Sequence, residues 1–151
     1  MTKEWRIIFI LPAIAMIASC SARAVYYDEE KALARKRVER FHEYYNRNDY
    51  DALYSLFSVE MRMAQPKDTV LPAMKTTFGT WGKSEGSAVV IEKVYLGPPV
   101  QVRMIYNTSF EKGKAQEWFI WTSDGKEASL MQYQVFPSWA DPEKVKSAIS
   151  K

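Results

Sequence analysis

The chain has very few of the residues from which metal sites and disulfides are built. Among its 151 residues there is one cysteine and one histidine. A single cysteine excludes an intramolecular disulfide, so packing must stabilise the fold. The same scarcity leaves no paired ligands for zinc, and Asp28-Glu29-Glu30 lacks the Asp and Gly alternation of a calcium loop. We therefore expect no metal site and no cofactor.

The chain also lacks the motifs that bind nucleotides or nucleic acids. Gly82-Lys83-Ser84 has no upstream glycine of the kind a phosphate-binding loop needs, and no Gly-x-Ser-x-Gly elbow occurs. The formal net charge is only +3, and no stripe of Arg and Lys alternates regularly with aromatic residues. Nucleic acid is thus not an expected partner.

The N-terminal apolar stretch is too short to span a bilayer. Residues 7–19 carry no charge over 13 positions and include Pro12, whereas a spanning helix needs about 20 apolar residues. Lys3 and Arg6 precede the stretch as a small basic start. This combination is typical of a signal peptide.

The stretch ends in Ile17-Ala18-Ser19-Cys20, which resembles the lipobox of bacterial lipoproteins: an aliphatic residue, two small residues and the lipidated cysteine. The resemblance implies cleavage before Cys20, a diacylglycerol on its thiol and an acyl chain such as palmitate on its new amine. Each buried methylene contributes about 0.8 kcal/mol, so two or three chains anchor a protein durably. Ser21 replaces the Asp that retains Gram-negative relatives at the inner membrane, so the resemblance implies the outer membrane, facing the periplasm. An ordinary secretory signal or an uncleaved anchor is the alternative.

Cleavage before Cys20 would divide the chain simply. Residues 1–19 would be the signal peptide, 20–27 a lipidated tether and 28–151 a single domain. The loss of Lys3, Glu4 and Arg6 would lower the formal net charge from +3 to +2. An aromatic content of 14% is enough for a substantial core.

Three helices are predicted in the first half of the domain. In the first, residues 28–46, the apolar face comprises Ala34, Val38, Phe41 and Tyr45. The run Arg35-Lys36-Arg37 is interpreted as a solvated helix face, with a lipid-headgroup patch as the alternative. Asn48 or Asp49 caps a second helix, whose stripe comprises Tyr50, Leu53, Phe57 and Met61. Asp68 or Thr69 caps a third, with Pro72 in its first turn and the stripe Leu71, Met74 and Phe78.

After Gly86 the hydrophobic period changes to two, which predicts strands at 87–96, 100–110, 116–122 and 128–136. Glu111-Lys112-Gly113-Lys114 and Asp124-Gly125 predict hairpin turns. We expect the charged strand residues Glu92, Arg103 and Glu117 on the polar outer face. Asp141-Pro142-Glu143 predicts the start of a short C-terminal helix.

This order of elements predicts an α+β fold, with three N-terminal helices packed in a curved four-stranded antiparallel sheet. Residues 41–45, residues 48–58 and the closing hairpin 118–133 resemble the nuclear transport factor 2-like (cystatin-like) superfamily over about residues 30–137. The resemblance implies a cone with an internal pocket.

Enzymes with this fold, such as ketosteroid isomerase and the polyketide cyclases, place an Asp or His inside the cone as a base. The resemblance gives His42 or Asp49 as candidates, but one histidine without a positioned acid makes a poor catalytic set. Capping already explains Asp49. We therefore predict no catalytic residues.

Other residues are candidates for a pocket or a partner surface. Trp118, Phe119, Ile120 and Trp121 make both faces of one strand apolar, which indicates either a strand packed on both sides or an exposed aromatic surface. The candidates are His42, Tyr45, Met104, Trp118 and Trp121.

The sequence thus predicts a non-enzymatic cell-envelope lipoprotein that binds a partner protein or a small apolar ligand. A small isomerase or hydrolase using the cone is the first alternative. The second is an accessory subunit of a secretion or conjugation apparatus, since the periplasmic core protein of type IV secretion systems has a similar fold. That family is normally held by a membrane helix, which this chain replaces with a lipobox.

Overall fold

Four helices precede four strands in the computed structural model, which describes residues 11–137 and their side chains from Tyr27 onward. The helices are α1 (Leu11–Asn46), α2 (Tyr50–Ser55), α3 (Val59–Ala64) and α4 (Lys67–Trp81). The strands are β1 (Ser84–Tyr95), β2 (Val100–Phe110), β3 (Gly113–Ser123) and β4 (Ala128–Phe136). The fold is α+β, as predicted. The predicted C-terminal helix at Asp141 lies outside the described residues.

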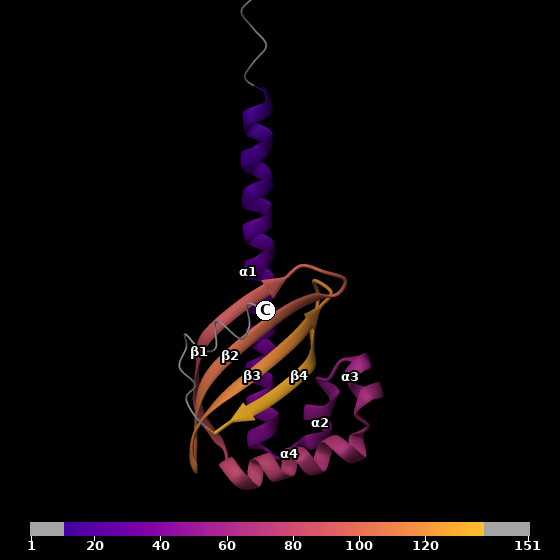
Figure 1. Cartoon of the computed structure of the whole chain (residues 1–151), viewed down its shortest axis with the longest axis vertical. Coiled ribbons are helices and arrows are strands. Elements are labelled where there is room, and N and C mark those ends of the chain that lie inside the picture. Colours follow the sequence, from indigo (N-terminus) through magenta and orange to yellow (C-terminus); the bar gives the residue numbers. More distant parts are fainter. Residues whose placement is uncertain (1–10, 138–151) are drawn as a thin grey trace, which may run out of the picture.

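Helix α1 is the longest described element, and it is already helical from Leu11 onward, well before the predicted start at Asp28. Its second half lies against the sheet, while its first half extends beyond it (Figure 1). The predicted apolar face is confirmed, because Ala34, Val38, Phe41 and Tyr45 are all buried. A spacing of three or four residues brings these side chains onto one stripe of the helix.

The end of α1 is set by Asn48, which has a left-handed φ of 56°. Asparagine adopts this conformation more readily than most residues. The Asp49 side chain then accepts a hydrogen bond from the Ala52 backbone N–H at 3.1 Å and caps α2, as predicted. Asn46 donates its side-chain N–H to the Ser84 carbonyl and accepts from the Ser84 N–H, each at 2.8 Å. This amide pair ties the end of α1 to the first residue of β1.

The predicted second helix is interrupted, so residues 50–64 contain two helices, α2 and α3, where the sequence indicated one. Phe57 forms a parallel bridge with Leu130 of β4, and the Ser58 N–H donates to the Leu130 carbonyl at 2.8 Å. Ser58 then caps α3 by accepting from the Met61 N–H at 3.1 Å. The interruption covers the free edge of β4, which would otherwise expose unpaired backbone groups.

Helix α4 begins at Lys67, two residues earlier than a cap at Asp68 predicts, with Pro66 at its N-cap position and no side-chain cap. It buries Val70 and Met74, whereas Leu71 is only half-buried. Pro72 lies inside the helix. The helix ends at Gly82, whose φ of +73° terminates it.

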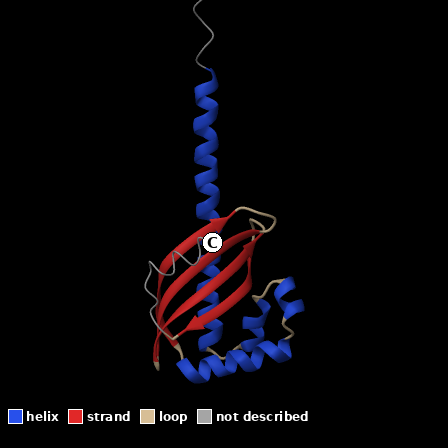
Figure 2. Cartoon of the chain, viewed as in Figure 1, coloured by secondary structure: helices blue, strands red, loops and turns tan. Residues whose placement is uncertain are grey.

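The four strands form one antiparallel sheet in the order β1-β2-β3-β4. The sheet curves around the second half of α1, and all four helices lie on its concave side or beyond its ends (Figure 2). The β2–β3 register pairs Met104 with Phe119 and Val102 with Trp121. These residues form the inner face with α1, and alternate residues form the outer face. The core is therefore enclosed between the concave face and the helices.

Candidate functional site

The most polar part of the interior surrounds Glu117 of β3, which is completely buried. We expected Glu117 on the polar outer face, and this expectation was wrong. Glu117 lies two residues before Phe119, and alternate residues of a strand share a face. Phe119 and Trp121 are both in the core, so the pleat brings the Glu117 carboxylate inside with them.

Three side chains from three other elements donate hydrogen bonds to this carboxylate. Tyr133 of β4 donates its hydroxyl to Oε1 at 2.7 Å. The Nε2 atom of His42 on α1 lies 2.8 Å from Oε2, and the Thr108 hydroxyl of β2 bonds to the same oxygen. Glu117 and these three partners, which we call the Glu117 cluster, therefore join α1 to three consecutive strands.

The Glu117 cluster shifts the ionisation of its members in opposite directions. Burial alone would raise the pKa of Glu117, but attraction to His42 and the hydrogen bonds from its three partners hold that pKa below its usual range. Burial, followed by the negative charge of Glu117, raises the pKa of Tyr133 well above its usual value. The cluster thus holds a carboxylate and a neutral phenol.

His42 is more accessible than Glu117, with 12% of its side chain exposed against 1%. Its ring lies edge-on to Phe41 and Phe119, with centroids 6.0 Å away in each case. A carboxylate bonded to one imidazole nitrogen is the arrangement that orients a histidine as a base. The sequence argument against catalysis assumed that no acid is positioned beside His42, and Glu117 removes that premise.

Three other predicted site residues belong to the packed core. Tyr45, Met104 and Trp121 are 1%, 1% and 0% exposed. Trp121 is thus not on an outer surface. It lies with Phe119 on the inner, buried face of β3. The Tyr45 hydroxyl and the Trp121 indole N–H are buried without a hydrogen-bond partner.

Trp118 lies on the opposite, outer face of β3 and is half-buried. Its indole N–H donates to Gln116 Oε1 at 3.0 Å, and its ring packs against Phe136 with centroids 4.9 Å apart. Trp118 packs against Ile105 of β2 and Ile91 of β1, which form a second, smaller apolar cluster. Of the five candidates, Trp118 alone lies on this face.

The other charged strand residues divide between the two faces. Arg103 is on the outer face as predicted, with its guanidinium 4.4 Å above the Tyr95 ring. Glu92 is opposite Met104 in the β1–β2 register, so it faces α1, and its predicted outer position was wrong. Both Glu92 oxygens bond to Arg35 of α1.

Ion pairs also account for most of the basic run on α1. Arg35 pairs with Glu92, and Arg37 pairs with Glu127 at 3.2 Å. These two side chains therefore hold α1 to the sheet, which argues against a lipid-headgroup patch formed by Arg35-Lys36-Arg37.

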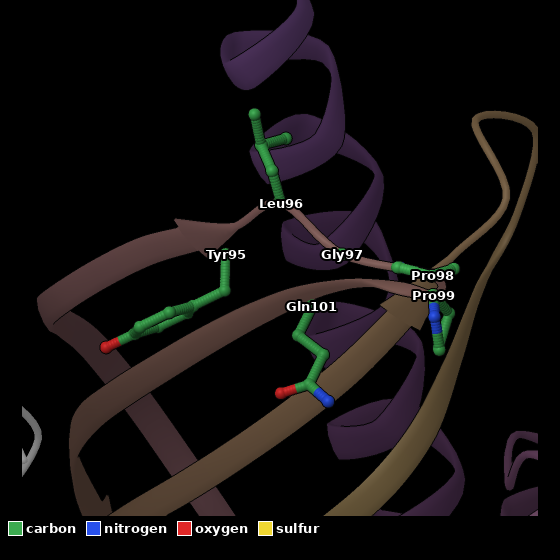
Figure 3. Close-up of a pocket in the computed structure, with 6 residues that line it drawn as sticks. All are labelled: Tyr95, Leu96, Gly97, Pro98, Pro99 and Gln101. Carbon is green, nitrogen blue, oxygen red and sulfur yellow. The ribbon is translucent and has the colours of Figure 1, made fainter.

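A surface hollow of about 260 Å³ lies at the β1–β2 connection. Figure 3 shows its lining, with Leu96 pointing away from the strands and the side chains of Tyr95 and Gln101 lying along the outer face. Gly97, Pro98 and Pro99 complete the lining. The Glu117 cluster does not contribute to this hollow.

The remaining predicted positions are explained locally or lie outside the described side chains. Asp49 caps α2 and is exposed, outside the interior that holds the Glu117 cluster. Ile17, Ala18, Ser19 and Cys20 belong to the backbone of α1, and their side chains lie outside the described part. Sequence reasoning missed Glu117, Thr108 and Tyr133, although the alternation of β3 placed Glu117 on the face of Phe119.

Between Tyr27 and residue 137, no group of three or more His, Cys, Asp or Glu side chains comes together as a metal site. No helix in the described part of the chain is long and apolar enough to cross a membrane. The chain matches no protein-family model and no curated protein.

Proposed function

We propose that this chain is a non-enzymatic, lipid-anchored protein of the bacterial cell envelope, held by an acylated Cys20 and facing the periplasm.

 The domain binds a partner protein or a small apolar ligand. Its curved sheet and helices are proposed to form the cone of the nuclear transport factor 2-like superfamily.

The observation that carries the proposal is the position of the Ile17-Ala18-Ser19-Cys20 pattern on the part of α1 that extends beyond the sheet (Figure 1). Among the side chains of α1 that the structure describes, the first buried one is that of Glu30. Glu30 lies ten positions after Cys20, which corresponds to about 15 Å of helix. Cleavage before Cys20 would therefore leave the described contacts between α1 and the sheet intact.

The interior supports a binding or structural role more directly than a catalytic one. The Glu117 carboxylate already accepts hydrogen bonds from three side chains. Aromatic rings fill the space around it, with Phe41 centred 4.5 Å from Tyr133 and 5.2 Å from Phe119. A partner surface is better placed on the outer face, where Trp118 and Ile120 are only half-buried.

Exchange of Cys20 for Ala tests the anchor. We expect the native chain to incorporate labelled palmitate and to fractionate with membranes, whereas Cys20→Ala loses the label and enters the aqueous phase. Ala22→Ser leaves the Ile17-Ala18-Ser19-Cys20 pattern unchanged and serves as the matched control. Lipid labelling that persists in Cys20→Ala would contradict the proposal.

A crosslinked pulldown from envelopes, compared between the native chain and Trp118→Ala, tests the partner surface. Recovery of secretion-apparatus components would support the accessory-subunit alternative. Capture that is unchanged in Trp118→Ala would exclude this surface.

The second candidate function is an isomerase or hydrolase, and the contact between His42 and Glu117 is the observation that favours it. His42 would act as the base and Glu117 would orient it. Activity on a candidate substrate should then disappear in His42→Gln while the fold persists, and its dependence on pH should change in Glu117→Gln. A pH profile that is unaffected by Glu117→Gln would contradict the candidate.

A further inference from the structure

The connection between β1 and β2 presents an uncharged apolar tip to solvent. It consists of Leu96, Gly97, Pro98 and Pro99, all of which are exposed, and Leu96 has 48% of its surface accessible. A single exposed leucine is ordinary on a protein surface. The position of Leu96 relative to α1, however, indicates what it could contact.

The tip lies at the end of the sheet from which the first half of α1 extends (Figure 1). In Figure 3 the Leu96 side chain points away from the strands, whereas Tyr95 and Gln101 lie along the outer face. A membrane that holds Cys20 would therefore face Leu96, and α4 would lie at the opposite end of the sheet.

The length of helix between the anchor and the sheet keeps the tip close to that membrane. The ten helical steps from Cys20 to Glu30 span about 15 Å, and the polar layer on each side of a bilayer is about 5–8 Å thick. A helix that tilts toward the β1–β2 connection brings the tip into this layer.

We propose that the tip 96–99 is a second membrane contact, which inserts into the surface of the bilayer that holds Cys20. This inference rests on the proposed lipid anchor. The occupant is a phospholipid surface and not a protein, because the tip carries no charge and points toward the anchored end. The absence of charge also makes the contact insensitive to salt.

The scarcity of cysteine makes a direct test possible. With Cys20 acylated, Leu96→Cys adds the only free thiol to the mature chain, and a bimane probe can be attached there. The matched control is Ala73→Cys, an exposed apolar position on α4 at the opposite end. Both lipidated chains are placed in vesicles of phosphatidylethanolamine and phosphatidylglycerol that contain nitroxide-labelled lipids.

We expect the nitroxide lipids to quench the probe at 96 several-fold more than the probe at 73, equally at low and high salt. Equal quenching at the two positions would overturn the membrane contact. A blue-shifted emission at 96 without quenching would also overturn it, because a protein surface would then cover the tip.

Intact mass separates this inference from the anchor. An acylated Cys20 without quenching at 96 refutes the tip contact and retains the anchor. An unacylated Cys20 refutes the anchor, and the tip contact then stands only if bimane at 96 in Cys20→Ser is still quenched by the same vesicles.

Discussion

At the scale of single residues, Glu117 shows how a charged side chain can be accommodated in a core. An isolated buried carboxylate would cost several kcal/mol, and hydrogen-bonded partners offset that cost. Tyr133, His42 and Thr108 supply those partners from three other elements. The Glu117 cluster therefore favours one arrangement of α1 on the sheet over others.

Acid should weaken this arrangement in a predictable direction. The pKa of Glu117 is lower in the folded chain than its ordinary value of 4.5, so the carboxylate contributes stability above about pH 4.5 that is lost as the pH falls through the folded pKa. We expect the free energy of unfolding, measured by urea denaturation between about pH 5 and pH 3, to fall more steeply in the native chain than in Glu117→Gln.

Comparison with Glu117→Gln is needed because other carboxylates contribute to the acid response. The pKa values of Glu60 and Asp124 are also lowered, in each case mainly by backbone hydrogen bonds. Parallel curves for the native chain and Glu117→Gln would show that Glu117 is not stabilised as described.

The residues of this cluster were only partly predictable from the sequence. His42 was identified because it is the single imidazole and lies between Phe41 and Tyr45 on the apolar side of α1. The charge of Glu117 predicts an outer position, whereas the alternation of β3 predicts the inner face of Phe119, and the alternation is correct. Thr108 and Tyr133 become recognisable only when the register aligns β2 and β4 with β3.

At the scale of elements, local patterns predicted the strands well and the helix boundaries less well. β2 and β4 have the predicted bounds, because alternation and turn residues are local signals. The break between α2 and α3 was missed, because Phe57 and Met61 continue a helical spacing. The bridge from Phe57 to Leu130 joins residues far apart in the chain, and no local pattern reports it.

The connection from α4 to β1 depends on Gly82. Its φ is +73°, and a Cβ at this position would lie 2.6 Å from Glu111 Oε2. The same Glu111 oxygen accepts a hydrogen bond from the Lys83 N–H at 2.9 Å, so the carboxylate cannot move away without losing that bond.

We expect Gly82→Ala to lower the free energy of unfolding by about 1–3 kcal/mol, because of backbone strain and the contact with Glu111. The matched control is Gly79→Ala, since Gly79 lies inside α4 and a Cβ there meets nothing within 4 Å. That change should stabilise the chain by about 0.5–1 kcal/mol. Thermal and urea unfolding measure both, and equal effects would contradict the role of Gly82.

At the scale of the whole molecule, α1 has two parts with different contacts. From Glu30 onward it supplies buried residues and the ion pair from Arg35 to Glu92. Before that point it extends beyond the sheet (Figure 1). The sequence predicted a membrane anchor in the first part and the start of the folded domain in the second. It did not predict that one helix continues through both.

This division predicts the effect of shortening the chain. A protein that begins at residue 20 should have the same free energy of unfolding as the full chain, within about 0.5 kcal/mol, when both are measured by urea denaturation. A protein that begins at residue 36 loses Glu30, Ala34 and Arg35, and should be destabilised by several kcal/mol because two buried side chains and an ion pair are removed. Equal stability of the two truncated chains would refute the division.

The continuity of α1 between Cys20 and Glu30 also couples distance to rotation. A helix turns about 100° for each residue, so inserting one residue in this segment would swing the sheet around the helix axis while moving it only about 1.5 Å outward. A flexible tether would transmit no such rotation. In the proposed anchored protein, the number of residues in this segment would therefore set which side of the domain leans toward the membrane.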